Sequence, residues 1–280
     1  MADAGTKGAK LRPDFATLLG LLVAVGGILR GLFIEGGSWA DLCGGSAALI
    51  VFGGTCGAVM VTTPLPVLKR GLQRLRATIF EPAEETGAVI EQIIGFASKA
   101  RKQGIVSLEA EADLLTDPFL KKAMNLAVDG TDLQDLRKMM ELELDMEERR
   151  GEAEARVFEA AGGYAPTIGI IGAVLGLIQV MKHIENTKEV GAGIAVAFIA
   201  TVYGVGSANL LFLPVANKIK ARLHSTIETK ELMLEGVVGI VEGLNPKLIR
   251  SKLEAYLHPS EPRKDAGKSP GVAGQPVRAN

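Results

Sequence analysis

Four stretches of the sequence are long, apolar and free of aspartate and glutamate. They cover residues 15–34, 42–61, 166–184 and 192–213. Each approaches the length of about 20 residues that a helix needs to cross the hydrocarbon core of a bilayer. Only Arg30 and Lys182 interrupt them with charge, and both lie near span ends, where a long basic side chain reaches the interface. The sequence therefore predicts four transmembrane helices.

The basic residues around these stretches indicate the topology. The links at 35–41 and 185–191 are short and carry little basic charge. The other three flanks are basic, through Lys7, Lys10 and Arg12, then Lys69, Arg70, Arg74 and Arg76, and finally Lys218, Lys220 and Arg222. Because basic loops stay in the cytoplasm, we expect both termini and the long middle loop to be cytoplasmic.

The pattern between and after the spans is helical. Apolar residues recur at helical spacing between Val89 and Ala100, Gly104 and Gly130 are placed to end helices, and Thr131 with Gln134 forms a capping box for a long charged helix. We therefore expect an all-α membrane protein with a helical cytoplasmic domain between helices 2 and 3 and cytoplasmic helical extensions. The expected segments are 1–64 (tail and two spans), 65–163 (cytoplasmic domain), 164–216 (two spans), 217–257 (helical extension) and 258–280 (disordered tail).

Composition and motifs argue against several functions. With 48% hydrophobic residues, 34 glycines and a net charge of −1, the chain resembles neither a soluble enzyme nor a nucleic-acid-binding protein. It has no phosphate-binding loop, nucleophile elbow or paired-carboxylate motif in a plausible context. The three histidines are scattered, so no metal site is indicated. We expect no catalytic activity and no cofactor.

An ion path through hydrocarbon normally needs an ionisable group, yet the four stretches contain no carboxylate. Their polar side chains include Thr167, Gln179, Thr201, Tyr203, Ser207 and Asn209. Hydroxyls and amides can line a path, but they do not bind and release protons near neutral pH. If the chain conducts protons, a partner has to supply the carboxylate.

The glycine pairs and the two prolines of the spans can each be interpreted in more than one way. Pairs at GxxxG spacing, Gly27/Gly31, Gly53/Gly57 and Gly172/Gly176, permit close helix contact within one subunit, between subunits or around a partner helix. Pro166 suits the first position of the third span, and Pro214 lies where the fourth span ends. Pro214 would leave the carbonyl of Leu210 without its donor, which either bends the helix or admits water.

Several segments together resemble the MotA/PomA family, the A subunits of flagellar stators. They are DFATLLGLL, SKARKQGIVSLE, GGYAPTIGIIGAVLGLIQVM, ATVYGVGSANLLFLPVANKIK and GLNPKLIRSKL, which cover most of the chain in the expected order, whereas 259–280 falls outside the resemblance. The resemblance implies a five-membered ring around a dimer of a single-span, MotB-like B subunit in the bacterial inner membrane. The aspartate of that B subunit would carry the ion.

The resemblance also implies residue roles. Arg101, Lys102 and Glu109, which have a local explanation as helix caps, match charged positions that face the rotor protein FliG. The ion path would include Pro166, Pro214, Thr201 and Ala173, with Asp41 near the outer mouth.

Sodium-type relatives have threonine where this chain has Ala173, so the loss of an oxygen ligand favours protons over Na⁺. Three alternatives remain open: a TolQ/ExbB-like proton channel that energises another envelope process, a Na⁺-driven stator subunit, and an interaction scaffold without conduction. TolQ/ExbB-type channels typically have three spans, and this sequence predicts four.

Overall fold

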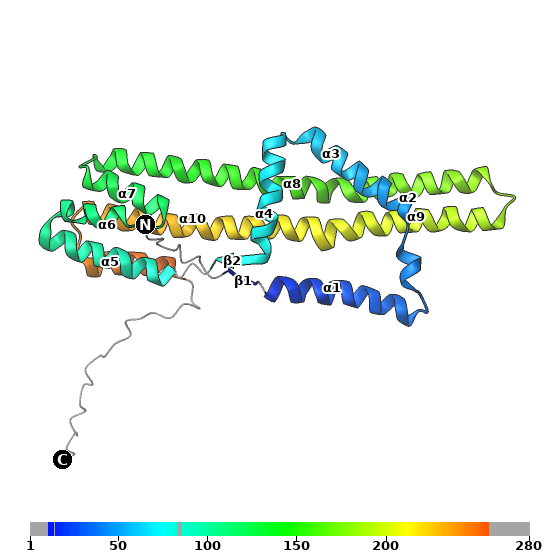
Figure 1. Cartoon of the computed structure of the whole chain (residues 1–280), viewed down its shortest axis with the longest axis horizontal. Helices are drawn as coiled ribbons and strands as arrows, with labels where there is room; N and C mark the ends of the chain where they lie inside the picture. Colours follow the sequence, from blue (N-terminus) through cyan, green and yellow to red (C-terminus); the bar gives the residue numbers. More distant parts are fainter. Residues whose placement is uncertain (1–10, 14, 83–85, 258–280) are drawn as a thin grey trace, which may run out of the picture. The chain divides into compact units, whose positions relative to one another are not determined.

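The computed structural model describes residues 11–13, 15–82 and 86–257, shown in Figure 1. The expected disordered tail at 258–280, and Lys7 and Lys10, lie outside the described residues. The described residues divide into two units, one built from 11–82 and 141–227 and the other from 86–140 and 228–257. We call them the span unit and the second unit.

In the described part of the chain, four helical segments are long and apolar enough to cross a membrane, which confirms the prediction. The first is α1 (Phe15–Ile34). The second combines a 3₁₀ turn η1 (Trp39–Leu42), α2 (Gly45–Ala48), a π-helical segment η2 (Leu49–Gly53) and α3 (Gly54–Thr62). The third lies in α8 (Leu133–Lys182). The fourth comprises α9 (Thr187–Ser207) and a π-helical segment η4 (Ala208–Phe212), and continues into α10 (Leu213–Val241).

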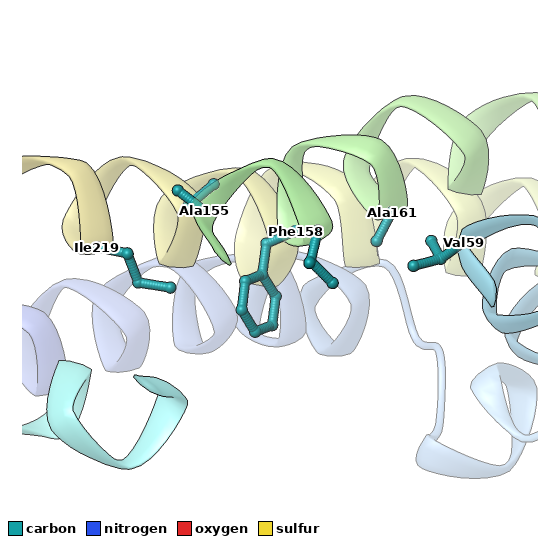
Figure 2. Packing of buried hydrophobic residues seen from close by; sticks show 7 residues of the cluster. Val59, Ala155, Phe158, Ala161 and Ile219 are labelled. Carbon is teal, nitrogen blue, oxygen red and sulfur yellow. The ribbon is translucent and has the colours of Figure 1, made fainter. Parts of the chain in front are cut away.

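An apolar cluster joins three of these helices. Val59 on α3, Phe158 and Ala161 on α8, and Ile219 on α10 are buried together (Figure 2). The amphipathic helix α4 (Leu65–Ile79) packs against this cluster through its partly buried apolar residues. The buried Ile219 and Leu223 confirm that the fourth helix continues beyond the span with an apolar face turned inward.

One part of the span unit is not helical, contrary to the expectation of helices alone. β1 (Leu11–Pro13) pairs antiparallel with β2 (Phe80–Pro82), with Arg12 opposite Glu81. Each strand has only three residues and ends in proline, which has no backbone donor to continue a helix or a longer ladder. These short strands leave the fold class unchanged.

The second unit is a small helical domain. It contains α5 (Thr86–Gln103), η3 (Ile105–Leu108), α6 (Glu109–Asp113), α7 (Pro118–Val128), the first residues of α8, the end of α10, α11 (Pro246–Leu253) and η5 (Glu254–Tyr256). Ile93, Phe119, Met124, Val237 and Ile249 are each at most 1% exposed and belong to its core.

Both glycines expected to end helices in this unit do so. Gly104 follows α5 with φ +81° and Gly130 follows α7 with φ +75°, a backbone conformation that favours glycine. The expected capping box of Thr131 and Gln134 is wrong. Instead, the carboxylate of Asp132 accepts a hydrogen bond from the backbone N–H of Gln134 (2.9 Å), and α8 begins at Leu133. Asp caps helices at least as well as Thr, so the cap shifts by one residue.

Candidate functional site

Glycines bring the third and fourth spans into backbone contact. A Cβ at Gly176 on α8 would lie 2.7 Å from the carbonyl oxygen of Gly193 on α9, and one at Gly204 would lie 2.6 Å from that of Ala165. No side chain larger than hydrogen fits at either position without moving the backbone. A Cβ added at Gly172 would lie 2.7 Å from the Cβ of Ala200, so Gly172 also packs within the chain. The pair Gly172/Gly176 therefore serves contact between helices of one subunit.

The other two GxxxG pairs have no such contact. Added Cβ atoms at Gly27 and Gly31 on α1, or at Gly53 and Gly57 in the second span, would meet nothing within 4 Å. None of the side chains of α1 is buried. These faces are open in the single chain.

Pro166 lies inside a helix rather than at the start of one. The interpretation of Pro166 as the first residue of a helix is wrong, because α8 runs unbroken from Leu133 to Lys182 and carries Pro166 in its interior. The charged helix before the span and the span itself are therefore one helix. Proline has no N–H to donate to the carbonyl of residue i−4, which here is Gly162.

Contacts between α8 and α9 place Pro166 and Thr201 on neighbouring turns of two packed helices. Ala165, next to Pro166, contacts Gly204, and Gly169 contacts Ala200, next to Thr201. Ala200 is fully buried, whereas Thr201 is exposed and its hydroxyl bonds back to the carbonyl of Ala197 (3.1 Å). Thr201 therefore lies on an outward face of the packed pair.

Pro214 follows a widened helical turn. The backbone N–H of Leu213 donates to Ala208, five residues earlier, so η4 is π-helical immediately before the proline. The side chain of Leu213 packs on Gly162, where a Cβ would lie 2.6 Å from its Cδ2. The structure thus brings the turn before Pro214 against the turn before Pro166, a proximity that the sequence did not predict.

Asp41 and Ala173 are the two remaining residues of the predicted ion path. Asp41 is exposed in η1, and its carboxylate accepts a hydrogen bond from the backbone N–H of Ser38 (2.6 Å). Ala173 is partly buried on α8, one residue after the contact glycine Gly172. The hydroxyls of Thr167 and Ser207 bond to backbone carbonyls of their own helices, so they have local partners.

Tyr203 ties the second span to the fourth. Its hydroxyl donates to the carbonyl of Leu42 and accepts from the N–H of Gly44 (3.2 Å). Cys43 and Gly44 are in extended conformation between η1 and α2, so this short piece lacks helical hydrogen bonds. A membrane offers such backbone groups no water, and the tyrosine supplies both partners. The sequence showed Tyr203 as one polar residue of the span without indicating this contact.

A buried carboxylate lies outside the predicted spans. The side chain of Glu154 on α8 is only 6% exposed and pairs with two arginines of α4, Arg74 at 2.8 Å and Arg70 at 3.3 Å. Gly71, between the arginines, lets α4 approach so closely that a Cβ there would lie 3.2 Å from the backbone oxygen of Glu154. In the sequence, Arg70 and Arg74 indicated only the topology, and nothing pointed to this ion pair with Glu154.

The three charged residues of the expected rotor contact surround one turn of the second unit. Arg101 and Lys102 end α5, Gly104 reverses the chain, and Glu109 begins α6. All three are exposed, and none has an ion-pair partner among the described residues. No group of His, Cys, Asp and Glu in the described residues could hold a metal ion.

Comparisons with known proteins agree with this architecture. Residues 111–232 match the MotA/TolQ/ExbB proton channel family. Motility protein A of Bacillus subtilis (strain 168) is 36% identical over 248 residues, covering 87% of this chain and 91% of that protein. The solved C. jejuni MotAB structure matches with a TM-score of 0.85 and 32% identity, covering 89% of this chain and 98% of the matched chain. The flagellar MotAB stator complex from Bacillus subtilis matches with a TM-score of 0.80 and 35% identity, covering 88% and 97%.

The chain belongs to the MotA/TolQ/ExbB proton channel family and is a multi-pass membrane protein. Within that family, several of the proteins that it resembles over most of its length carry the name motility protein A. The resemblance to the MotA/PomA family that was inferred from the sequence is confirmed. The family consists of channels, which also confirms the expectation that the chain is not an enzyme.

Proposed function

We propose that this chain is the A-type channel subunit of a flagellar stator and couples inward proton flow to torque on the rotor. The observation that carries the proposal is the match of 89% and 88% of the chain to two MotAB stator structures, in a chain with four helices long and apolar enough to span a membrane. The carboxylate-free spans fit this assignment, because an A-type subunit would work with a partner that brings the ionisable group.

The partner would be a dimer of a single-span, MotB-like B subunit, surrounded by a ring of five copies of this chain. The open glycine faces of α1 and of the second span support association, since they have no neighbour within the chain. The packed α8–α9 pair, with Thr201 outward and the two proline turns in contact, would line the ion path together with Ala173. Asp41 would lie near its outer mouth, and Arg101, Lys102 and Glu109 would face the rotor protein FliG.

The proposed topology also divides the chain into membrane and cytoplasmic segments. Residues 1–64 and 164–216 would form the membrane part in the bacterial inner membrane, while 65–163, 217–257 and the 258–280 tail would lie in the cytoplasm with both termini. The basic flanks support this orientation.

Cysteine labelling tests the orientation. In a variant that lacks Cys43 and Cys56, a cysteine at Ser38 is expected to react with an impermeant thiol reagent in intact cells. A cysteine at Gln103, at the end of α5, should react only after the membrane is opened. Labelling of both positions in intact cells, or of Gln103 alone, would disprove the proposed topology.

Ion flux tests the function and separates it from the alternatives. When the chain is co-expressed with its B-type partner in cells that lack stators, swimming should follow the proton motive force and persist without sodium. An inactive scaffold would give neither ion flux nor swimming. Flux without swimming would indicate a TolQ/ExbB-like role, and rotation that stops when potassium replaces sodium at constant pH and membrane potential would indicate a Na⁺-driven stator.

A further inference from the structure

The C-terminal half of α1 carries an open groove of about 490 Å³. It is lined by Gly26, Leu29, Arg30, Phe33 and Ile34. Their spacing of three and four residues brings them onto one side of the helix. Gly26 leaves a notch there, because a Cβ added at this position would meet nothing within 4 Å. The groove is therefore apolar except for one guanidinium group.

Arg30 is the one charged residue in the sequence of α1, and its charge has no partner. The side chain is exposed and forms no hydrogen bond or ion pair within the described residues. Arg30 lies four residues before the end of the helix, about 6 Å along its axis. The long stem of arginine bridges such a distance, so the guanidinium reaches the boundary between hydrocarbon and headgroups. An unpaired cation is thus placed at the depth of lipid phosphates.

Two aromatic rings mark the same depth. Phe33, which lines the groove, packs edge-on against Trp39 of η1, with ring centroids 5.4 Å apart and ring planes at 67°. Both side chains remain exposed, by 44% and 59%. Tryptophan is enriched where a membrane meets water, because its ring is apolar and its N–H is polar. The groove therefore begins at the headgroup level and continues along the helix into the hydrocarbon.

The groove and the glycine pair Gly27/Gly31 occupy different sides of α1. Successive residues of an α-helix are rotated by about 100°, which turns these two glycines about a third of a turn away from the groove. Association of α1 with a neighbouring helix through the glycines therefore leaves the groove open to lipid.

We propose that this groove binds one phospholipid, with the phosphate against Arg30 and an acyl chain along Gly26, Leu29 and Phe33. The planar fork of arginine can hold two phosphate oxygens at once, and both partners are charged. The groove contains one cation and no acid, so a net-anionic phospholipid binds more tightly than a zwitterionic one. The site needs α1 to span the membrane but does not depend on the stator function. The proposed topology places it in the outer leaflet.

Native mass spectrometry of the complete stator, purified with its B-type partner, tests the site. The probe is phosphatidylglycerol titrated into the detergent solution, and the measured quantity is the number of lipid molecules retained per copy of this chain. Arg30→Gln should raise the concentration for half-occupancy about threefold to tenfold, because a charge-assisted contact is lost. Lys182→Gln is the matched control, since it removes the other basic residue of the spans, which does not line the groove. It should leave retention unchanged.

Two further probes identify what the groove recognises. Glycerophosphoglycerol, the soluble headgroup, should not displace the lipid. Diacylglycerol, which has the acyl chains without the phosphate, should be retained equally by the original protein and by Arg30→Gln. Displacement by the soluble headgroup would show an anion site that does not use the groove, and would overturn the proposal. Unchanged retention of phosphatidylglycerol in Arg30→Gln, or an equal loss in Lys182→Gln, would overturn it as well.

A photo-crosslinker at Leu29 in living cells distinguishes lipid from protein in the groove. Adducts with phospholipid are expected. Adducts with a second copy of this chain or with the B-type partner would show that the groove is a protein interface, and the lipid assignment would then be wrong.

Discussion

Replacing Pro166 or Pro214 by leucine is expected to reduce rotation at least about tenfold while assembled protein remains near its normal amount in the membrane. At Pro166, leucine restores an N–H that can donate to Gly162 in the middle of α8, where proline costs about 3 kcal/mol relative to good helix formers. At Pro214, it restores a donor directly after the π-helical turn of η4. Both helices should become more regular and stiffer, because π-turns and prolines are places where helices bend.

The two substitutions should affect the same contact region, where the turn before Pro166 packs against the turn before Pro214. The side chain of Leu213 packs on Gly162, so the residue before Pro214 contacts the residue whose carbonyl Pro166 leaves without a donor. A joint built from two such turns can move without breaking side-chain packing elsewhere, and restoring either donor should be enough to stop it. We therefore expect the double variant to be no worse than either single variant.

Pro118→Leu is the matched control. Pro118 is the first residue of α7, where a helix has no acceptor for the missing N–H, so the same substitution should leave motility unchanged. The measurement is rotation speed of tethered cells divided by the amount of stator in the membrane fraction. If rotation falls only in proportion to lost protein, the prolines serve packing alone.

Replacing Glu154 by lysine is expected to remove most of the protein from the membrane. The new cation would be buried against Arg70 and Arg74, with no carboxylate left to pair with them. Breaking a fully buried ion pair in this way costs about 3–5 kcal/mol of stability. The arginines keep 50% and 40% of their side-chain surface in solvent, which moderates the loss. Glu154→Gln, which keeps the shape, should cost only about 1–2 kcal/mol.

Glu152→Lys provides the comparison on the same helix. The side chain of Glu152 is 44% exposed, and its only ion-pair partner in the described part of the chain is Arg156, one turn away, so reversing its charge should change stability by less than about 1 kcal/mol. The amount of protein in the membrane fraction and the unfolding temperature in detergent measure both variants. The double exchange of Glu154→Arg with Arg74→Glu should recover part of the loss. Equal behaviour of the two lysine variants would show that α4 is not held by this pair.

Local signals explain what the sequence predicted well. The first span was bounded at both ends as α1, and Gly104 and Gly130 ended α5 and α7, because apolar length and a positive φ at glycine depend on neighbouring residues alone. The cap of α8 was displaced by one residue because Thr131 and Asp132 are both good caps. Pro166 was misplaced because a proline that can begin a helix can also lie inside one in a membrane.

The contacts that could not be predicted from the sequence join residues that are far apart along the chain. Tyr203 and Leu42 are 161 positions apart, and Arg74 and Glu154 are 80 apart, so no spacing rule connects them. The π-helical segments η2 and η4 consist of apolar and small residues with one asparagine, and nothing in those residues distinguishes them from an ordinary helix. The predicted site residues are placed in space by the structure, and their roles stay predictions.

The first helix differs from the last two spans in a way that bears on how the protein is made. α1 buries no side chain, and a Cβ added at any of its four glycines would meet nothing within 4 Å. Its backbone hydrogen bonds lie within the helix, which is what the hydrocarbon of a bilayer requires. The third and fourth spans meet backbone to backbone and need each other for that packing. During synthesis, α1 can enter the bilayer alone as soon as it leaves the ribosome, whereas the later pair matures only after both helices have been inserted. The order of translation is thus also an order of assembly, with the helix that packs least within the chain inserted before the pair proposed to carry ions.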